Sequence, residues 1–230
     1  MKVKHLVGAF LCVLGCYACS SPKTEVQSPD GHIKMTLTVD ENGKPFYNVS
    51  VDDSLLIENS AMGFTAANGI ILAEGFQVKN TTFSSEDETW TQPWGENKKN
   101  RNHYNEMAVS LTNEDQVQLT LRFRVFDDGI GFRYEYTVPT VDSLLITDEL
   151  TTFHFHRDGT SWSIPASAET YELLYQQQPI SEVETANTPF TFKTADGVYG
   201  SIHEAALYDF PEMTLKQIGH YTSVSYTHLT

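Results

Sequence analysis

Cysteine is nearly absent from this chain. Of 230 residues only three are cysteines, and all of them, Cys12, Cys16 and Cys19, fall within the first 19 residues. The remainder has no thiol with which to form a disulfide or a thiolate metal site. A fold built from it must rest on packing and hydrogen bonds rather than on covalent cross-links.

Basic residues are scarce as well. The chain has 15 Lys and Arg against 30 Asp and Glu, which gives a formal net charge of −15 at pH 7. Nucleic-acid affinity depends on cationic side chains that neutralise phosphates, so this balance argues against a nucleic-acid partner. A carbohydrate or a cation fits such a chain better. Aromatic residues make up 12% of the sequence, which supplies ample material for a core, unlike a disordered acidic tail.

The chain lacks a hydrophobic run long enough to span a bilayer. Its apolar segment, residues 6–14, is short and follows a basic start, as in a secretory signal. We expect a lipoprotein signal peptide over residues 1–19, with lipidation at Cys16 or Cys19. A plain signal peptide with incidental cysteines is the alternative. A lipid anchor predicts membrane attachment in the periplasm or at the outer membrane of a Gram-negative bacterium.

A helical period is missing too, and short segments of alternating apolar and polar residues take its place. Residues 33–39, 46–51, 117–125 and 130–136 alternate in this way, and turn residues such as Asp127-Asp128-Gly129 separate them. The pattern predicts an all-β fold of antiparallel sheets packed face to face. We expect a core-facing hairpin over 117–136 and a hairpin at the domain's edge over 32–51.

The domain boundaries follow from changes in composition. Residues 20–27 are mostly polar and are expected to form a tether, and residues 28–221 are expected to form the β-domain. Within it, residues 84–103 are predicted to be a long loop, which in a compact domain is often functional. This stretch holds Trp90 and Trp94, whose flat rings could cover a sugar, could pin the loop to the sheet or could pack on a neighbouring domain.

His203 and Glu204 are candidate functional residues because they follow a predicted strand, residues 198–202, which begins after the turn Asp196-Gly197. Side chains at a strand end project from a rigid scaffold into whatever cleft lies there. On spacing alone, a solvated or hydrogen-bonded His-Glu pair is the favoured alternative. Asn187, in Asn187-Thr188-Pro189, reads as a turn residue and is kept as a second candidate contact.

Several short motifs follow one another in a characteristic order along the chain. They are Ser28-Pro29-Asp30-Gly31-His32-Ile33, Trp94-Gly95-Glu96, Arg101-Asn102-His103-Tyr104-Asn105-Glu106, Phe126-Asp127-Asp128-Gly129-Ile130-Gly131-Phe132-Arg133-Tyr134, Trp162-Ser163-Ile164-Pro165-Ala166, Tyr171-Glu172, Ala186-Asn187-Thr188-Pro189 and His203-Glu204-Ala205-Ala206-Leu207. Taken together, they resemble the amino-terminal domain of glycoside hydrolase family 97. Each motif is weak alone, whereas their shared order is specific.

The resemblance implies a β-supersandwich of galactose-mutarotase-like type, packed on a catalytic (β/α)8 barrel that this sequence does not contain. It implies that Glu204 is a calcium ligand in an active site acting on an α-linked glucoside or galactoside. It also makes Asn187, His203, Trp90 and Trp94 candidate substrate contacts. We find no pair of carboxylates that would serve as acid and base, so no residue is assigned a catalytic role.

Residues 222–230 match none of these motifs and resemble translated sequencing adapter. We therefore expect them to be a non-native tail, and we expect the natural chain to continue from about Tyr221 into the barrel. The competing reading is a stand-alone carbohydrate-binding or structural β-domain without catalysis.

Overall fold

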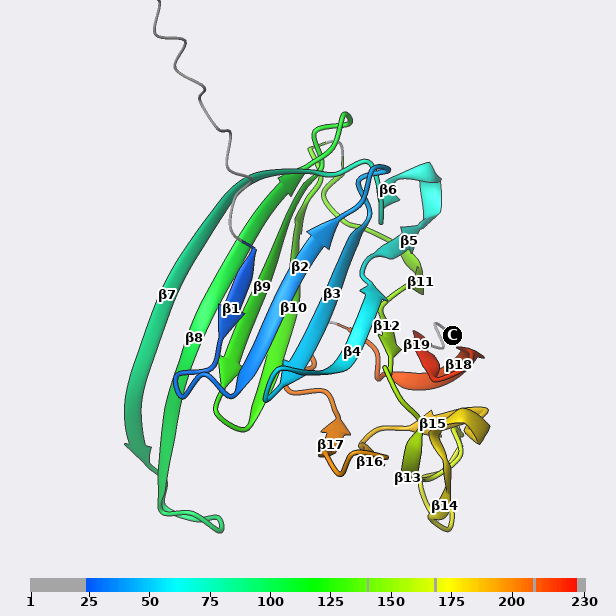
Figure 1. The fold of residues 1–230 in the computed structure, drawn as a ribbon. Coiled ribbons are helices and arrows are strands. Elements are labelled where there is room, and N and C mark those ends of the chain that lie inside the picture. Colours follow the sequence, from blue (N-terminus) through cyan, green and yellow to red (C-terminus); the bar gives the residue numbers. More distant parts are fainter. Residues whose placement is uncertain (1–23, 140, 168, 209, 227–230) are drawn as a thin grey trace, which may run out of the picture.

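The computed structural model describes residues 24–139, 141–167, 169–208 and 210–226. In these ranges the regular structure consists of antiparallel strands and two 3-10 turns, η1 (Ala67–Gly69) and η2 (Ile180–Glu182). The all-β prediction is confirmed (Figure 1). The predicted leader, with Cys16 and Cys19, lies outside the described residues, and so does the first half of the predicted tether, residues 20–23.

The first sheet contains β1 (Glu25–Gln27), β2 (Ile33–Val39), β3 (Pro45–Val51) and β4 (Ser54–Ala61) in that spatial order. The hairpin predicted over 32–51 is confirmed as β2 and β3, but its predicted place at the edge is wrong, since β1 and β4 flank it. The tether prediction is also wrong for Glu25–Gln27. Val26 lies opposite Met35 and is only 6% exposed, so its apolar side chain draws this segment into the sheet.

The second sheet has the order β10 (Gly129–Thr137), β9 (Gln118–Phe126), β8 (Lys99–Thr112) and β7 (Gln77–Thr91). The hairpin predicted over 117–136 is confirmed, with Leu121 opposite Tyr134. The alternating residues of β9 are buried, and those of β10 pack against them. The strict period of two arises because one face of this hairpin meets the core and the other meets solvent.

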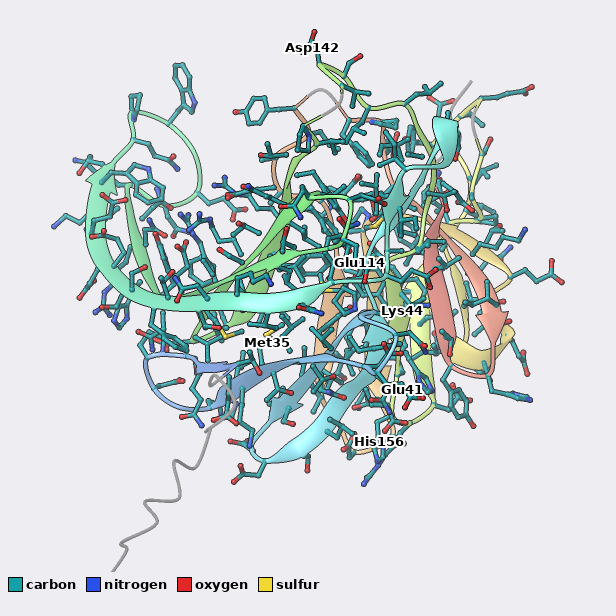
Figure 2. The ribbon with its side chains drawn as sticks, turned by 90° about the horizontal axis from the view of Figure 1, so that it is seen from above. Met35, Glu41, Lys44, Glu114, Asp142 and His156 are labelled. Carbon is teal, nitrogen blue, oxygen red and sulfur yellow. The ribbon has the colours of Figure 1, made fainter. Side chains whose placement is uncertain are left out.

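The core lies between these two sheets. Met35, on the first sheet, is fully buried and points toward the second (Figure 2). Tyr47 of β3 packs on Phe132 of β10 with ring centroids 5.6 Å apart, and its hydroxyl donates a hydrogen bond to the carbonyl of Thr152. Burial of each such side chain contributes about 1.5–3 kcal/mol. The packing thus fixes the two sheets face to face as a sandwich.

The loop predicted over residues 84–103 is reduced to the turn at residues 92–98, and the rest of that prediction is wrong. These residues form the outer half of the β7–β8 hairpin, which pairs without interruption from Ser84 opposite Glu106 to Thr91 opposite Lys99. Figure 1 shows the hairpin curving out beyond the sandwich. Almost all of outer β7 is exposed, so no buried face imposes a period of two on its sequence. Backbone pairing, which sequence pattern does not record, holds this part together.

Three smaller sheets complete the domain. Their strands are β5 (Phe64–Ala66), β6 (Ile71–Leu72), β11 (Ile146–Glu149), β12 (Thr152–His154), β13 (Gly159–Ser163), β14 (Gln176–Pro179), β15 (Thr185–Asn187), β16 (Phe190–Thr194), β17 (Tyr199–Ile202), β18 (Thr214–Gly219) and β19 (Thr222–Tyr226). The sheet orders are β11-β5-β6, β12-β19-β18-β15 and β14-β13-β16-β17.

Strand β19 corrects the predicted carboxy-terminal boundary. Thr222–Tyr226 pair with both β18 and β12, so the folded part runs past Tyr221. Within this strand Ser225 is fully buried, and its hydroxyl donates a hydrogen bond to Glu149 at 2.6 Å. Residues 227–230 lie outside the described residues. Within the described part of the chain, no helix has the length and apolar character needed to cross a membrane.

Candidate functional site

Glu204 stands just past the end of a short hairpin. β16 and β17 pair with Phe190 opposite Ile202, and Gly197 makes the turn with a φ of 94°, a left-handed conformation that suits glycine. Phe190 is fully buried and fixes the base of this hairpin in the core. The structure therefore confirms that His203 and Glu204 follow a strand held by the scaffold. His203 is exposed, whereas Glu204 is half-buried.

Two segments hold the Glu204 carboxylate. Its Oε1 accepts a hydrogen bond from the backbone N–H of Met213 at 2.7 Å. Among the described residues, its Oε2 has a single long contact, 3.5 Å, with the hydroxyl of Thr188, which also reaches the Met213 carbonyl at 3.5 Å. One carboxylate oxygen is thus fixed by a strong bond, while the other keeps most of its capacity to accept.

The electrostatic surroundings of Glu204 are negative. Burial raises the pKa of this carboxyl, and the nearby carboxylates Glu212 and Glu149 raise it further, against the lowering effect of the Met213 hydrogen bond. Tyr171 belongs to the same neighbourhood, since its hydrogen bond with Glu212 raises the pKa of the Tyr171 hydroxyl. The site therefore gathers negative charge around a partly desolvated carboxylate.

The donor set suits a hard cation in type but falls short in number. Glu204, Glu212 and Thr188 offer oxygen atoms only, which Ca²⁺ prefers, and a bound cation would relieve the repulsion among the carboxylates. Ca²⁺ takes six to eight oxygens. Among the described residues, no group of three or more His, Cys, Asp or Glu is arranged as a complete metal site. His203 is a soft nitrogen donor and a poor match for this ion.

Asn187 lies at the end of β15, next to the cis peptide bond between Thr188 and Pro189. The residue is only 1% exposed, and its backbone N–H donates to the carbonyl of Ile164 at 3.0 Å. Neither polar atom of its side chain has a hydrogen-bond partner in the described part of the structure. Asn187 thus adjoins Thr188 in sequence, but its amide is enclosed, and its role as a substrate contact stays a prediction.

The two tryptophans lie elsewhere. Trp90 is on outer β7 and is 50% exposed, and Trp94, in the turn between β7 and β8, is 83% exposed. Trp94 lines a shallow hollow with Thr91 and Lys98 at the hairpin tip. The structure rules out that these rings pin a loop to the sheet. It does not bring them to Glu204, and their contact with sugar stays a prediction.

Sequence reasoning missed the residues that surround Glu204. The sequence could have indicated Thr188, because this residue lies in the same short motif as Asn187. Glu149 and Glu212 carried no signal, since Glu149 ends the distant strand β11 and Glu212 lies in a loop before β18. Only the tertiary packing shows that these two carboxylates raise the pKa of Glu204.

Comparison with known proteins connects this geometry to a family. The family model described as Glycosyl-hydrolase 97 N-terminal matches residues 26–229. A curated protein of Bacteroides thetaiotaomicron, named Retaining alpha-galactosidase, is 24% identical over 229 residues, which cover 93% of this chain and 33% of that protein.

Solved structures agree with that match. A glycoside hydrolase family 97 enzyme from Pseudoalteromonas sp. strain K8, in complex with panose, is 36% identical with a TM-score of 0.82, over 88% of this chain and 31% of that one. An enzyme of the same family and strain, in complex with acarbose, gives the same values. A beta-arabinopyranosidase at 21% identity and a TM-score of 0.77 shares the fold. The chain thus spans about a third of the length of these relatives, and it belongs to glycoside hydrolase family 97 as an amino-terminal domain.

Proposed function

We propose that this chain is the amino-terminal part of a calcium-dependent glycosidase that acts on α-linked glucosides or galactosides. In this proposal Glu204 supplies one calcium ligand to an active site that a catalytic barrel completes. The domain itself positions that ligand and supports the barrel, and it contributes no acid or base. When bound, calcium would supply Lewis-acid stabilisation of charge at the reacting sugar.

The observation that carries the proposal is the state of the Glu204 carboxylate. Oε1 is fixed by the Met213 N–H, Oε2 is largely free, and the neighbouring charges are negative rather than positive. A buried carboxylate that only stabilised the fold would be expected to have a cationic partner or several hydrogen bonds. The arrangement instead favours a bound metal cation whose remaining ligands come from another part of the protein.

The substrate class rests on the relatives. One relative is named an alpha-galactosidase, and another was solved with panose, an α-linked glucose oligosaccharide. We assign no acid–base pair of carboxylates to the described residues, so in this proposal the choice between inversion and retention lies with the barrel. His203 and Asn187 remain candidate substrate contacts beside the proposed ligand.

Calcium titration of the complete enzyme tests the proposal. Glu204→Gln removes the charged ligand but keeps an acceptor for the Met213 N–H, so the fold should be retained. We expect calorimetry to show at least tenfold weaker calcium binding, and turnover of an aryl α-glucoside or α-galactoside to fall with it. Glu114→Gln, in the exposed β8–β9 turn, is the matched control. Wild-type calcium affinity and rate in Glu204→Gln would refute the ligand role.

We propose in addition that a lipid on Cys16 or Cys19 anchors the protein to a membrane, which would place it in the periplasm or at the outer membrane. The support is the short apolar segment before these cysteines and the polar residues after Cys19. A fatty-acid probe fed to a Gram-negative host should label the wild-type chain and leave a Cys16→Ser, Cys19→Ser double variant unlabelled. Absence of label on the wild type would reject the anchor.

A further inference from the structure

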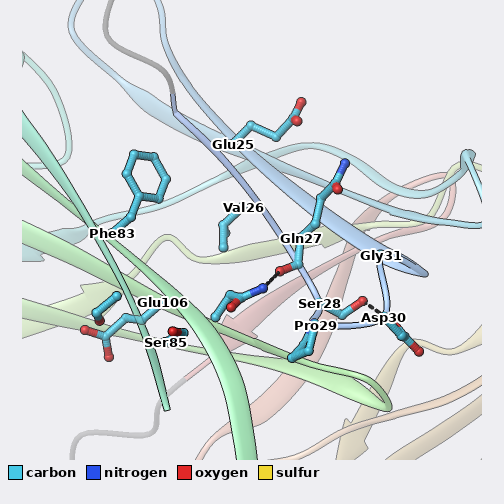
Figure 3. A pocket seen from close by; sticks show the side chains of 12 residues that line it. Glu25, Val26, Gln27, Ser28, Pro29, Asp30, Gly31, Phe83, Ser85 and Glu106 are labelled. Atoms are coloured by element: carbon cyan, nitrogen blue, oxygen red, sulfur yellow. Dashed lines mark hydrogen bonds between the residues drawn. The ribbon is translucent and has the colours of Figure 1, made fainter. Parts of the chain in front are cut away.

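An open groove lies between the short edge strand β1 and the β7–β8 hairpin (Figure 3). It has a volume of 710 Å³, and residues 25–31 line one side while Phe83, Ser84, Ser85, Asn105 and Glu106 line the other. A volume of this size falls in the range of small-molecule sites. The groove belongs to the main sandwich, whereas Glu204 follows β17 in one of the smaller sheets.

Phe83 is the apolar feature of this groove. It pairs with Met107, which is fully buried, so both residues lie on the face of the hairpin that continues into the core. Phe83 is nevertheless 51% exposed, because this is the point at which the hairpin leaves the sandwich. A ring held half-open on a rigid strand offers a flat apolar surface to a ligand at little entropic cost.

Uncharged polar groups stand next to that ring. Ser85 and Asn105 form the next cross-strand pair on the same face. The amide Nδ2 of Asn105 donates to the Gln27 carbonyl at 2.9 Å, which ties β1 to the hairpin and sets the width of the groove. The Gln27 amide and the Ser85 hydroxyl supply both donors and acceptors. An aromatic face flanked by such groups matches the C–H face and the hydroxyls of a sugar ring.

The lining selects against other ligands. It contains no Lys or Arg, whereas Glu25 and Asp30 carry negative charge, so an anion would be repelled. A peptide that added a strand to β1 would need the outward backbone groups of that edge, and Asn105 already occupies the Gln27 carbonyl. We propose that this groove is an accessory binding site for a neutral oligosaccharide, separate from the Glu204 site and independent of calcium.

Ligand-observed NMR and calorimetry on the 230-residue chain test this site, with maltoheptaose and stachyose as probes and EDTA present. The wild type should show saturation transfer to at least one sugar. Phe83→Ala should weaken binding at least tenfold, since loss of a covered aromatic face is worth roughly 1.5 kcal/mol or more. Ser85→Arg should weaken binding similarly by filling the groove, and both positions are exposed enough to leave the fold intact.

Tyr199→Ala is the matched control, because Tyr199 is 66% exposed on β17 and does not line the groove. It should bind as the wild type does. The site is refuted if neither sugar binds the wild type, or if Phe83→Ala keeps full affinity. It is equally refuted if Trp94→Ala abolishes binding while Phe83→Ala does not, since the sugar would then sit at the hairpin tip. None of these outcomes depends on whether Glu204 binds calcium.

Discussion

Two carboxylates in this domain, Glu106 and Glu204, are both withdrawn from water but have opposite surroundings. Glu106 on β8 receives a hydrogen bond from Arg122 at 2.6 Å and another from Arg124 at 2.7 Å. Burial alone would raise the pKa of Glu106, but the two guanidinium groups outweigh burial and lower the pKa. Burial also raises the pKa of Glu204, and its charged neighbours add to the effect instead of opposing it.

The contrast separates a carboxylate that stabilises the fold from one that is kept for a ligand. Glu106 is part of a closed network, since Arg122 also binds Glu135 through both carboxylate oxygens. Its charge is neutralised within the sheet. The charged groups among the described residues that act on Glu204 are all carboxylates, so none of them neutralises it. Its charge is therefore available to a bound cation. Three measurements would break or sharpen this contrast.

The largest effect is expected from Glu106→Ala. Removing the least exposed member of this partly buried charge network leaves Arg124 without its carboxylate, and loss of hydrogen bonds between charged groups costs about 2–3 kcal/mol. Urea unfolding followed by circular dichroism should show this decrease in the free energy of unfolding. Glu114→Ala, at an exposed turn, should change it by less than about 0.5 kcal/mol. Equal losses in the two variants would show that the network does not stabilise the sheet.

An intermediate effect is expected from acid. The folded-state pKa values of Glu106 and Glu135 lie below the ordinary value of 4.5, so the unfolded state takes up protons first as the pH falls. Their stabilisation is complete above pH 4.5 and is lost as the pH drops through the folded-state values. The free energy of unfolding should decrease in that window, and the Glu106→Gln variant should show a shallower decrease. An unchanged slope would contradict the lowered pKa of Glu106.

The smallest effect is expected from Glu204→Gln in the absence of calcium. The folded-state pKa of Glu204 is raised, so its ionisation destabilises the fold as the pH rises through that value. Glutamine is neutral and can still accept the Met213 N–H. Urea unfolding at neutral pH in EDTA should therefore give a change within about 0.5 kcal/mol, or a slight gain. A loss of more than about 2 kcal/mol would make Glu204 a structural residue like Glu106.

The sequence predicted the elements that have one buried and one exposed face. The β9–β10 hairpin was recognised because Leu119, Leu121 and Phe123 alternate with polar residues, and a buried face enforces that period. The loop prediction for outer β7 is wrong because both faces of this part of the strand are exposed, as at Glu86 and Asp87. Backbone hydrogen bonds and the Asp87–Arg101 salt bridge at 2.7 Å hold this part of the hairpin. Neither interaction produces an alternation of apolar and polar residues in the sequence.

For the site, the same limit applies at the level of tertiary contacts. The turn at Gly197 and the strand after it placed Glu204 correctly at a strand end. The partners that decide its chemistry, Met213 through its N–H and Glu149 through its charge, come from other segments. Their approach depends on how β11, β17 and β18 pack, which no local pattern encodes. The charge balance excluded nucleic acid but could not distinguish Glu106 from Glu204.

The outer edge of β7 has a consequence for how copies of this domain behave in solution. This strand is 15 residues long and forms the edge of its sheet, so its outward N–H and C=O groups are open to pairing with another chain. Glu86 and Glu88 place negative charge along that edge, whereas the salt bridge with Arg101 compensates Asp87, and a second copy that paired around this segment would bring the same charges close to them. Mutual repulsion thus opposes edge-to-edge self-association at neutral pH, and high salt, which screens it, should be the condition that favours aggregation.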